Sequence, residues 1–117
     1  MDDFAAAHYD EFGFLASYAR HEGLTWTGPP AVARRTVALA GGQRLSGLVW
    51  GTAPAEIVLL HGIGQNAHTW DSVAMALRRP LVALDLPGHG HSDWRDDGDY
   101  RPRANAAAVA GAIAELA

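Results

Sequence analysis

Two short apolar runs, each ending in a glycine-containing turn, constrain the fold of this chain more than any other feature. Residues 57–60 lead directly into His61-Gly62-Ile63-Gly64, and residues 81–86 lead into Pro87-Gly88. The segment between the runs carries apolar residues at the spacing of one helical face: Trp70, Val73, Ala74 and Leu77. Such runs are typical of strands buried on both faces of a sheet, and their alternation with a helix favours parallel pairing. The pattern predicts an α/β fold.

The neighbouring segments extend this pattern on both sides. Residues 33–40 and 44–50 are predicted strands, and Gly41-Gly42 between them indicates a hairpin turn, because glycine tolerates a positive φ. Val37 and Leu39 share one face of the first strand. After a polar loop, a helix is expected from about residue 103. Its predicted apolar face consists of Ala106, Val109, Ala110, Ile113 and Leu116.

The N-terminal segment predicts an irregular helix over residues 2–22. Its apolar positions recur at helical spacing, although Gly13 interrupts them: Phe12, Leu15, Ala16 and Ala19. Residues 27–30 (Thr-Gly-Pro-Pro) then break the chain. We therefore expect a helical leader and linker over residues 1–30, followed by the main α/β domain over residues 31–117.

The composition excludes several kinds of chemistry. The 117 residues include no cysteine, so disulfides, thiolate metal sites and cysteine nucleophiles are excluded. All nine cationic residues are arginines, which excludes a Schiff-base lysine. The net charge of -4 comes without a basic patch, so neither a nucleic-acid nor a membrane partner is expected. The acidic N-terminus has no apolar signal region, and we expect a cytoplasmic protein.

The turn after the first apolar run has the composition of an anion-stabilising loop. Glycines beside a buried strand let backbone N–H groups face a cavity without obstruction by side chains, and such groups can stabilise a developing oxyanion. A plain strand-to-helix turn explains His61-Gly62-Ile63-Gly64 equally well on spacing alone. The second turn, Asp85-Leu86-Pro87-Gly88-His89-Gly90-His91-Ser92, follows the other apolar run and specifies a particular loop path.

Together, these two motifs resemble the α/β-hydrolase superfamily, whose members carry His-Gly-x-Gly and then Asp-x-Pro-Gly-His-Gly-x-Ser about twenty residues later. The resemblance covers roughly residues 33–117. It implies the N-terminal part of an α/β-hydrolase sheet, incomplete in this chain, and hydrolysis of an ester or similar acyl bond by a serine nucleophile. It implies no cofactor, and the expected partner is a small ester-like substrate. Gly64 disfavours epoxide hydrolases and haloalkane dehalogenases, which usually carry proline there.

The resemblance also assigns roles to residues of the first turn. The Ile63 backbone N–H would supply half of the oxyanion hole, and Gly64 would keep the turn open. His61 and Gly62 would shape the same loop. Asn66 and His68 either line the substrate pocket or cap the following helix, and both interpretations stay open.

The catalytic serine of the family is missing from these residues. None of the serines, Ser17, Ser46, Ser72 and Ser92, lies in the Gly-x-Ser-x-Gly elbow, which the resemblance places after the last helix. The acid and the catalytic histidine would come later still. We therefore expect a truncated hydrolase that is inactive alone. A non-catalytic fragment and one half of a split hydrolase are the alternatives.

Two further hypotheses concern a metal and self-association. His89 and His91 match the opening of a His-x-His-x-Asp-His metallohydrolase motif. Because position 94 is tryptophan we expect no metal site there, and a metal-dependent hydrolase that uses His89 and His91 stays an alternative. The resemblance places the strand over residues 57–60 beside the missing nucleophile strand. Its edge would then be unpaired, and we expect self-association through it.

Overall fold

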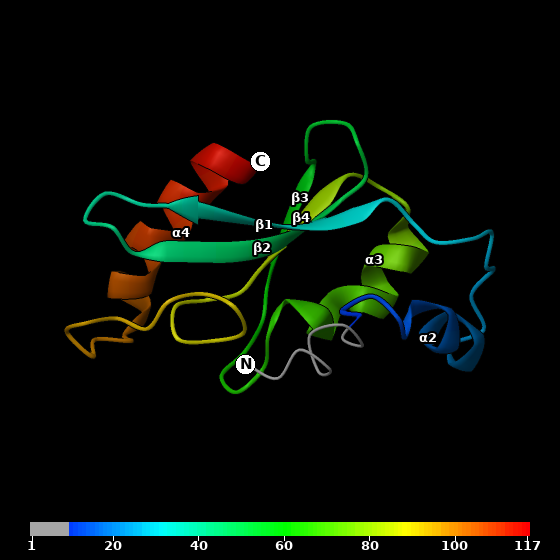
Figure 1. Cartoon of the computed structure of the whole chain (residues 1–117), viewed down its shortest axis with the longest axis horizontal. Helices are drawn as coiled ribbons and strands as arrows, with labels where there is room; N and C mark the ends of the chain where they lie inside the picture. Colours follow the sequence, from blue (N-terminus) through cyan, green and yellow to red (C-terminus); the bar gives the residue numbers. More distant parts are fainter. Residues whose placement is uncertain (1–9) are drawn as a thin grey trace.

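The computed structural model describes residues 10–117 and contains one four-stranded sheet (Figure 1). Its strands are β1 (Val32–Ala38), β2 (Arg44–Trp50), β3 (Ile57–Leu60) and β4 (Leu81–Leu84), in the spatial order β1-β2-β4-β3. The pairs β1–β2 and β2–β4 are antiparallel, whereas β3 and β4 are parallel. The predicted hairpin and the predicted parallel pair are both confirmed.

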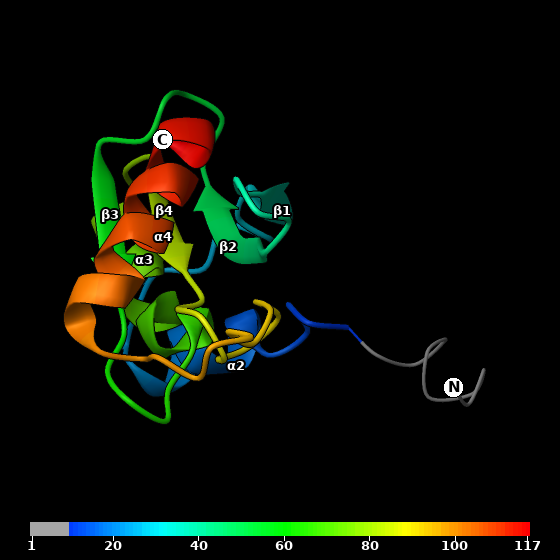
Figure 2. The same ribbon diagram turned by 90° about the vertical axis from the view of Figure 1, so that its left-hand side faces the viewer.

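Helices cover both faces of the sheet (Figures 1 and 2). The helical elements are α2 (Leu15–His21), the 3-10 turn η1 (Ala67–Trp70), α3 (Asp71–Leu77) and α4 (Pro102–Leu116). Leu48 of β2 faces the core beneath α2 and α3, and its neighbour Val49 faces α4. This alternation follows from the two-residue period of a strand. In β1 it directs Val37 toward α4 and Arg34 toward the opposite face.

The prediction of strands buried on both faces is right for β4 and wrong for β3. Every residue of β4 is buried, because the strand lies between two neighbours and beneath helices on both faces. The residues of β3 are only partly buried, and the Leu60 side chain is 45% exposed. Among residues 10–117, β3 pairs with β4 alone, so one of its edges and part of its surface lack a covering neighbour.

The buried face of α4 is rotated from the predicted one. Val109 and Leu116 are buried as predicted, whereas Ala106 and Ala110 are exposed. Ala108 and Ala112 take their place in the core. Alanines on several sides of this helix make more than one apolar face available, and packing against Leu45 and Leu84 of the sheet selects one of them.

The leader is less helical than predicted. Residues 11–14 form turns, and the helix spans only Leu15–His21. The part of the predicted helix over residues 2–9 lies outside the described residues. Leu15 is buried in the same core as Trp50 and Ala74, so α2 packs on the sheet domain beside α3. Within residues 10–117, no helix has the length and apolarity needed to cross a lipid bilayer.

Candidate functional site

The two predicted turns lie next to each other at one end of the sheet (Figure 1). The parallel register pairs Leu60 with Leu84, so both strands end at the same level. The turns are joined directly, because the Gly64 N–H donates to His89 Nε2 at 3.2 Å. The rings of His61 and His89 also pack together, with centroids 4.9 Å apart. Two motifs that are separate in the sequence therefore form one site.

His61 holds the two turns together from the inside. Its side chain is buried, its Nδ1 lies 2.7 Å from the Gly62 carbonyl, and its Nε2 lies 2.9 Å from the Leu86 N–H. Because Leu86 must donate to Nε2, the ring proton resides on Nδ1 and is donated to Gly62. Both ring nitrogens are thus occupied, so His61 shapes the loop and has no free nitrogen for proton transfer.

Three consecutive amides in the first turn differ in their partners. The Gly62 N–H donates to Gln65 Oε1 at 2.9 Å, and the Gly64 N–H donates to His89. The Ile63 N–H has no acceptor among residues 10–117, and the Ile63 residue is 99% exposed. The turn itself is possible because Gly64 has φ +78°, a left-handed conformation that side chains disfavour. A single free amide therefore lies between two restrained ones.

Asp85 joins the second turn to the rest of the site. Its carboxylate is fully buried and accepts from the Ala67 N–H at 2.7 Å and from the His91 N–H at 3.1 Å. The Arg34 guanidinium donates to the same carboxylate at 2.7 Å. A Cβ atom added at Gly90 would lie 2.3 Å from the carboxylate, so this position requires glycine. The loop motif therefore encloses a buried anion.

Asn66 is a capping residue in this structure. Its side-chain oxygen accepts from the His68 N–H at 2.8 Å, and its own N–H donates to Thr69 Oγ1 at 3.5 Å. The two contacts form a capping box at the start of η1. Of the two interpretations that the sequence left open for Asn66, the capping role is the one observed.

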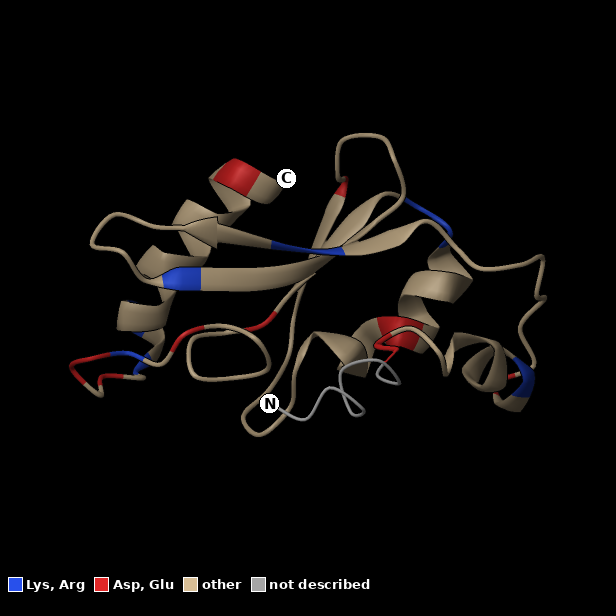
Figure 3. Ribbon diagram, in the orientation of Figure 1, with Lys and Arg blue, Asp and Glu red and all other residues tan. Residues whose placement is uncertain are grey.

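The side chain of His68 lies between two carboxylates. Its Nδ1 is 2.6 Å from Asp71 and its Nε2 is 2.7 Å from Glu11, which lies just before α2. Figure 3 shows acidic positions of this segment beside the acidic first turn of α3. The hydrogen bond to Asp71 raises the pKa of His68, burial opposes it, and the hydrogen bond to Glu11 adds to the increase.

Glu11 and Arg34 complete a charge network that sequence reasoning missed. Both carboxylate oxygens of Glu11 accept from the Arg34 guanidinium, and Arg34 also donates to Ser46 Oγ at 2.7 Å. Burial alone would raise the pKa of the Glu11 carboxyl, but Arg34 and His68 outweigh burial and lower that pKa. The pKa of Arg34 is raised, because its bonds to Glu11 and Asp85 outweigh burial.

The histidines of the second turn are placed differently from each other. His89 Nδ1 lies 3.0 Å from the Pro87 carbonyl and its Nε2 accepts from Gly64, so both ring nitrogens are occupied by the protein. His91 contributes its backbone N–H to Asp85, and the residue is exposed. Across residues 10–117, no group of three or more His, Cys, Asp or Glu side chains has the arrangement of a metal site.

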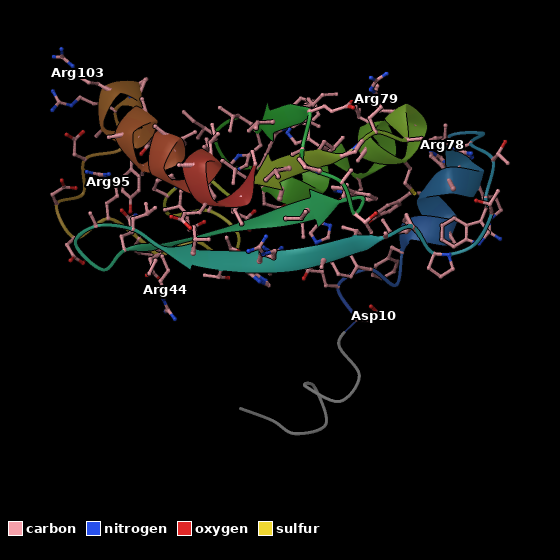
Figure 4. The ribbon with its side chains drawn as sticks, turned by 90° about the horizontal axis from the view of Figure 1, so that it is seen from above. Asp10, Arg44, Arg78, Arg79, Arg95 and Arg103 are labelled. Atoms are coloured by element: carbon pink, nitrogen blue, oxygen red, sulfur yellow. The ribbon has the colours of Figure 1, made fainter. Side chains whose placement is uncertain are left out.

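A cavity of about 410 Å³ lies at the other end of the sheet, between the segment after α2 and the end of α3. Trp26, Trp50 and Met75 line it. Figure 4 shows Arg78 and Arg79 at this end and Arg44 at the opposite one. The cavity shares no residue with either turn, so it is separate from the candidate site that the turns form.

Comparison with known proteins links both turns to one family. The Alpha/beta hydrolase family matches residues 57–117. Esterase Rv0045c of Mycobacterium tuberculosis is 46% identical over 108 residues, which cover 92% of this chain and 34% of the esterase. A solved structure of that esterase superposes with a TM-score of 0.82 and 45% identity, covering 94% of this chain and 36% of the other.

A thioesterase domain from the curacin biosynthetic pathway superposes with a TM-score of 0.65 and 27% identity, covering 74% of this chain and 34% of that domain. This chain therefore spans about a third of the length of the relatives it matches.

Proposed function

This chain belongs to the alpha/beta hydrolase family, and from that premise we propose that it forms the oxyanion-hole side of a hydrolase acting on an ester or similar acyl bond. In this proposal a serine outside these residues attacks the acyl carbon. The Ile63 N–H donates to the oxygen of the tetrahedral intermediate, which carries the developing negative charge. The N–H of the residue after the serine supplies the second donor.

The free amide at Ile63 is the observation that supports this proposal. Gly62 and Gly64 on either side are restrained by hydrogen bonds to Gln65 and His89, so the donor between them has a set orientation. A preorganised donor stabilises charge without reorganising during the reaction, which is why such donors contribute strongly to catalysis. The esterase named above, 46% identical, supports the acyl-bond specificity.

The environments of the buried serines support the proposal that the nucleophilic serine lies outside these residues. Ser92 Oγ donates to the Asp85 carbonyl at 2.6 Å and accepts from the Ser46 N–H at 2.9 Å. Ser46 Oγ accepts from Arg34. Neither hydroxyl has a histidine partner that could remove its proton, so neither has the activated geometry of a nucleophile.

Two preparations test the proposal with a short-chain p-nitrophenyl ester and a fluorophosphonate probe. The first is the 117-residue chain, for which we expect neither turnover nor labelling. The second is a hybrid in which residues 10–117 replace the matched segment of esterase Rv0045c; it should hydrolyse the ester and be labelled. Labelling of the chain alone would identify one of its own serines as a nucleophile. A folded but inactive hybrid would contradict the proposal.

Two substitutions in the hybrid separate the Ile63 amide from its side chain. Ile63→Pro removes the N–H, and loss of one oxyanion donor lowers kcat by about 100-fold or more. Ile63→Ala keeps the N–H and removes only an exposed side chain, so the hybrid should keep nearly full activity. Equal activity of these two variants would show that the Ile63 amide is not an oxyanion donor.

A further inference from the structure

Glu11 connects the segment before α2 to the candidate site over a long sequence separation. Its carboxylate reaches His68, 57 residues later, and Arg34, 23 residues later. The side chain of Glu11 is only 11% exposed, so these contacts are shielded from water. Buried charge-assisted contacts are stronger and less screened than surface ion pairs. This segment is therefore attached to the sheet domain by more than apolar packing.

The geometry around His68 requires a charged imidazole. Carboxylates lie within 2.7 Å of both ring nitrogens, Asp71 at Nδ1 and Glu11 at Nε2. An ionised carboxylate only accepts hydrogen bonds, so both ring nitrogens must carry protons. His68 then supplies a positive charge between two negative ones. Removing its proton would leave Asp71 and Glu11 facing each other across a neutral ring.

The network reaches the first turn by two routes. His68 is the second residue of η1, which begins directly after Asn66 at the end of the turn. By the other route, Glu11 binds Arg34, Arg34 binds Asp85, and Asp85 accepts from the Ala67 N–H. Both routes converge on Ala67 and His68. The end of the turn that carries Ile63 is thus held by charges that depend on Glu11.

We propose that Glu11 is a positioning residue for the oxyanion turn, acting through His68 and through the Arg34–Asp85 pair. The inference rests on the proposed function of that turn. Glu11 does not touch the turn amides itself; it sets the position of the segment that follows them. The segment before α2 thereby becomes part of the catalytic unit.

The same geometry makes the turn sensitive to pH. His68 faces Asp71 of α3 and Glu11, and the Phe12 ring packs beside it at 5.9 Å between centroids. Beyond them lie Arg34 and Asp85, which form an ion pair. His68 is therefore the group in this network that loses its charge as pH rises through its raised pKa, and this loss should weaken the attachment of Glu11 to η1.

NMR titration of the 117-residue chain tests the inference without depending on catalysis. In the unsubstituted chain, the amide signals of Ile63, Gly64 and Ala67 should shift with the same midpoint as the His68 ring. In Glu11→Gln, the midpoint of the His68 titration should fall toward the ordinary histidine value. At a pH below that midpoint, the turn amide signals of this variant should already differ from those of the unsubstituted chain. Glu22→Gln, which changes an exposed carboxylate at the C-terminal end of α2, should alter neither.

Two results would overturn the inference. One is a folded Glu11→Gln chain with unchanged turn amides and an unchanged His68 midpoint. The other is a set of turn amides in the unsubstituted chain that do not respond as His68 titrates. This second measurement needs no substitution, so it decides the question even where Glu11→Gln fails to fold.

The hybrid esterase separates this inference from the proposed function. Glu11→Gln should lower kcat about tenfold, because misplacement of a donor weakens transition-state binding, while KM stays within about twofold. Glu11→Asp, which keeps the carboxylate, should recover part of the loss. An active hybrid whose kcat is unchanged by Glu11→Gln would overturn the positioning role. An inactive hybrid would count against the proposed function alone, and the NMR titration would still decide the role of Glu11.

Discussion

The Asp85 carboxylate accepts a hydrogen bond from the Ala67 backbone N–H at 2.7 Å, although 18 residues separate the two positions. The contact ties the loop after β4 to the start of the helical segment after β3. Because Asp85 is fully buried and also binds Arg34, it fixes the relative position of the two turns. Stability and site geometry therefore depend on the same carboxylate.

Replacing Asp85 with asparagine should destabilise the chain by about 2 kcal/mol, because hydrogen bonds to a buried charged acceptor are lost, while Arg34 keeps Glu11 as its other partner. The new amide group would also face an N–H donor where an oxygen now accepts. Urea unfolding measures the effect. Asp96→Asn in the exposed part of the same loop should change the unfolding free energy by less than about 0.5 kcal/mol. Equal unfolding midpoints for the two variants would contradict the role of Asp85.

Gly90→Ala should be more destabilising than Gly98→Ala, although both glycines have positive φ. The values are +52° for Gly90 and +64° for Gly98, so both substitutions carry a similar backbone cost of about 1 kcal/mol. Only at Gly90 would the added Cβ collide with Asp85, whereas Gly98 has open space around it. Thermal unfolding of both variants should show the difference. Indistinguishable melting temperatures would mean that Asp85 makes room for the added Cβ without a loss of stability.

His89→Phe should release the Gly64 amide while keeping an aromatic ring beside His61. Loss of one hydrogen bond worth about 1 kcal/mol corresponds to about fivefold faster local opening. Amide hydrogen exchange followed by NMR should detect this increase at Gly64. The Leu86 amide, which is bonded to His61, serves as the internal control and should stay protected. Unchanged exchange at Gly64 would show that its contact with His89 contributes nothing in solution.

The stabilising contribution of His68 should disappear as pH rises. The pKa of His68 is raised in the folded chain, so its contribution is fully present below the ordinary value of 6.5 and is lost as pH rises through the folded pKa. The pKa of Glu11 is lowered, so its contribution is present above 4.5 and is lost as pH falls through the folded pKa. Docking of the segment before α2 should be strongest between these two values.

Urea unfolding at several pH values, comparing the unsubstituted chain with His68→Gln, measures this effect. The difference in unfolding free energy between them should be largest below pH 6.5 and should shrink as pH rises through the folded pKa of His68. His91→Gln, which changes an exposed histidine outside the network, is the control variant. A constant difference for His68→Gln would mean that folding does not raise the pKa of His68.

The exposed edge of β3 should cause the chain to self-associate. Within residues 10–117 this strand pairs with β4 alone, and an apolar strand with a free edge pairs readily with a second copy. Sedimentation velocity should show association that increases with concentration. Leu60→Lys, at a position that is 45% exposed, should reduce association without a loss of fold. A monodisperse monomer at high concentration would contradict this expectation.

Local patterns in the sequence were sufficient to predict the strands, helices and turns that carry the site. Residues 57–60 and 44–50 form strands over the predicted bounds, and the helix expected from about residue 103 begins at Pro102. The apolar runs, the Gly41-Gly42 turn and the helical spacing are all short-range signals, and the backbone follows them directly. The two glycine-containing turns meet for the same reason, since parallel strands bring their carboxyl ends to one edge of the sheet.

The side chains that those elements bring together could not be predicted from local patterns. Glu11, Arg34 and His68 are far apart in the chain, and no local periodicity marks them as partners. The face that α4 buries and the half-exposure of β3 were likewise set by which neighbours cover them. A charge buried among distant residues depends on packing across the whole domain, whereas a strand or a turn depends on the preferences of adjacent residues. The scaffold and its turns could therefore be predicted from local sequence patterns, whereas the charge network that holds them follows from the packing of the whole domain.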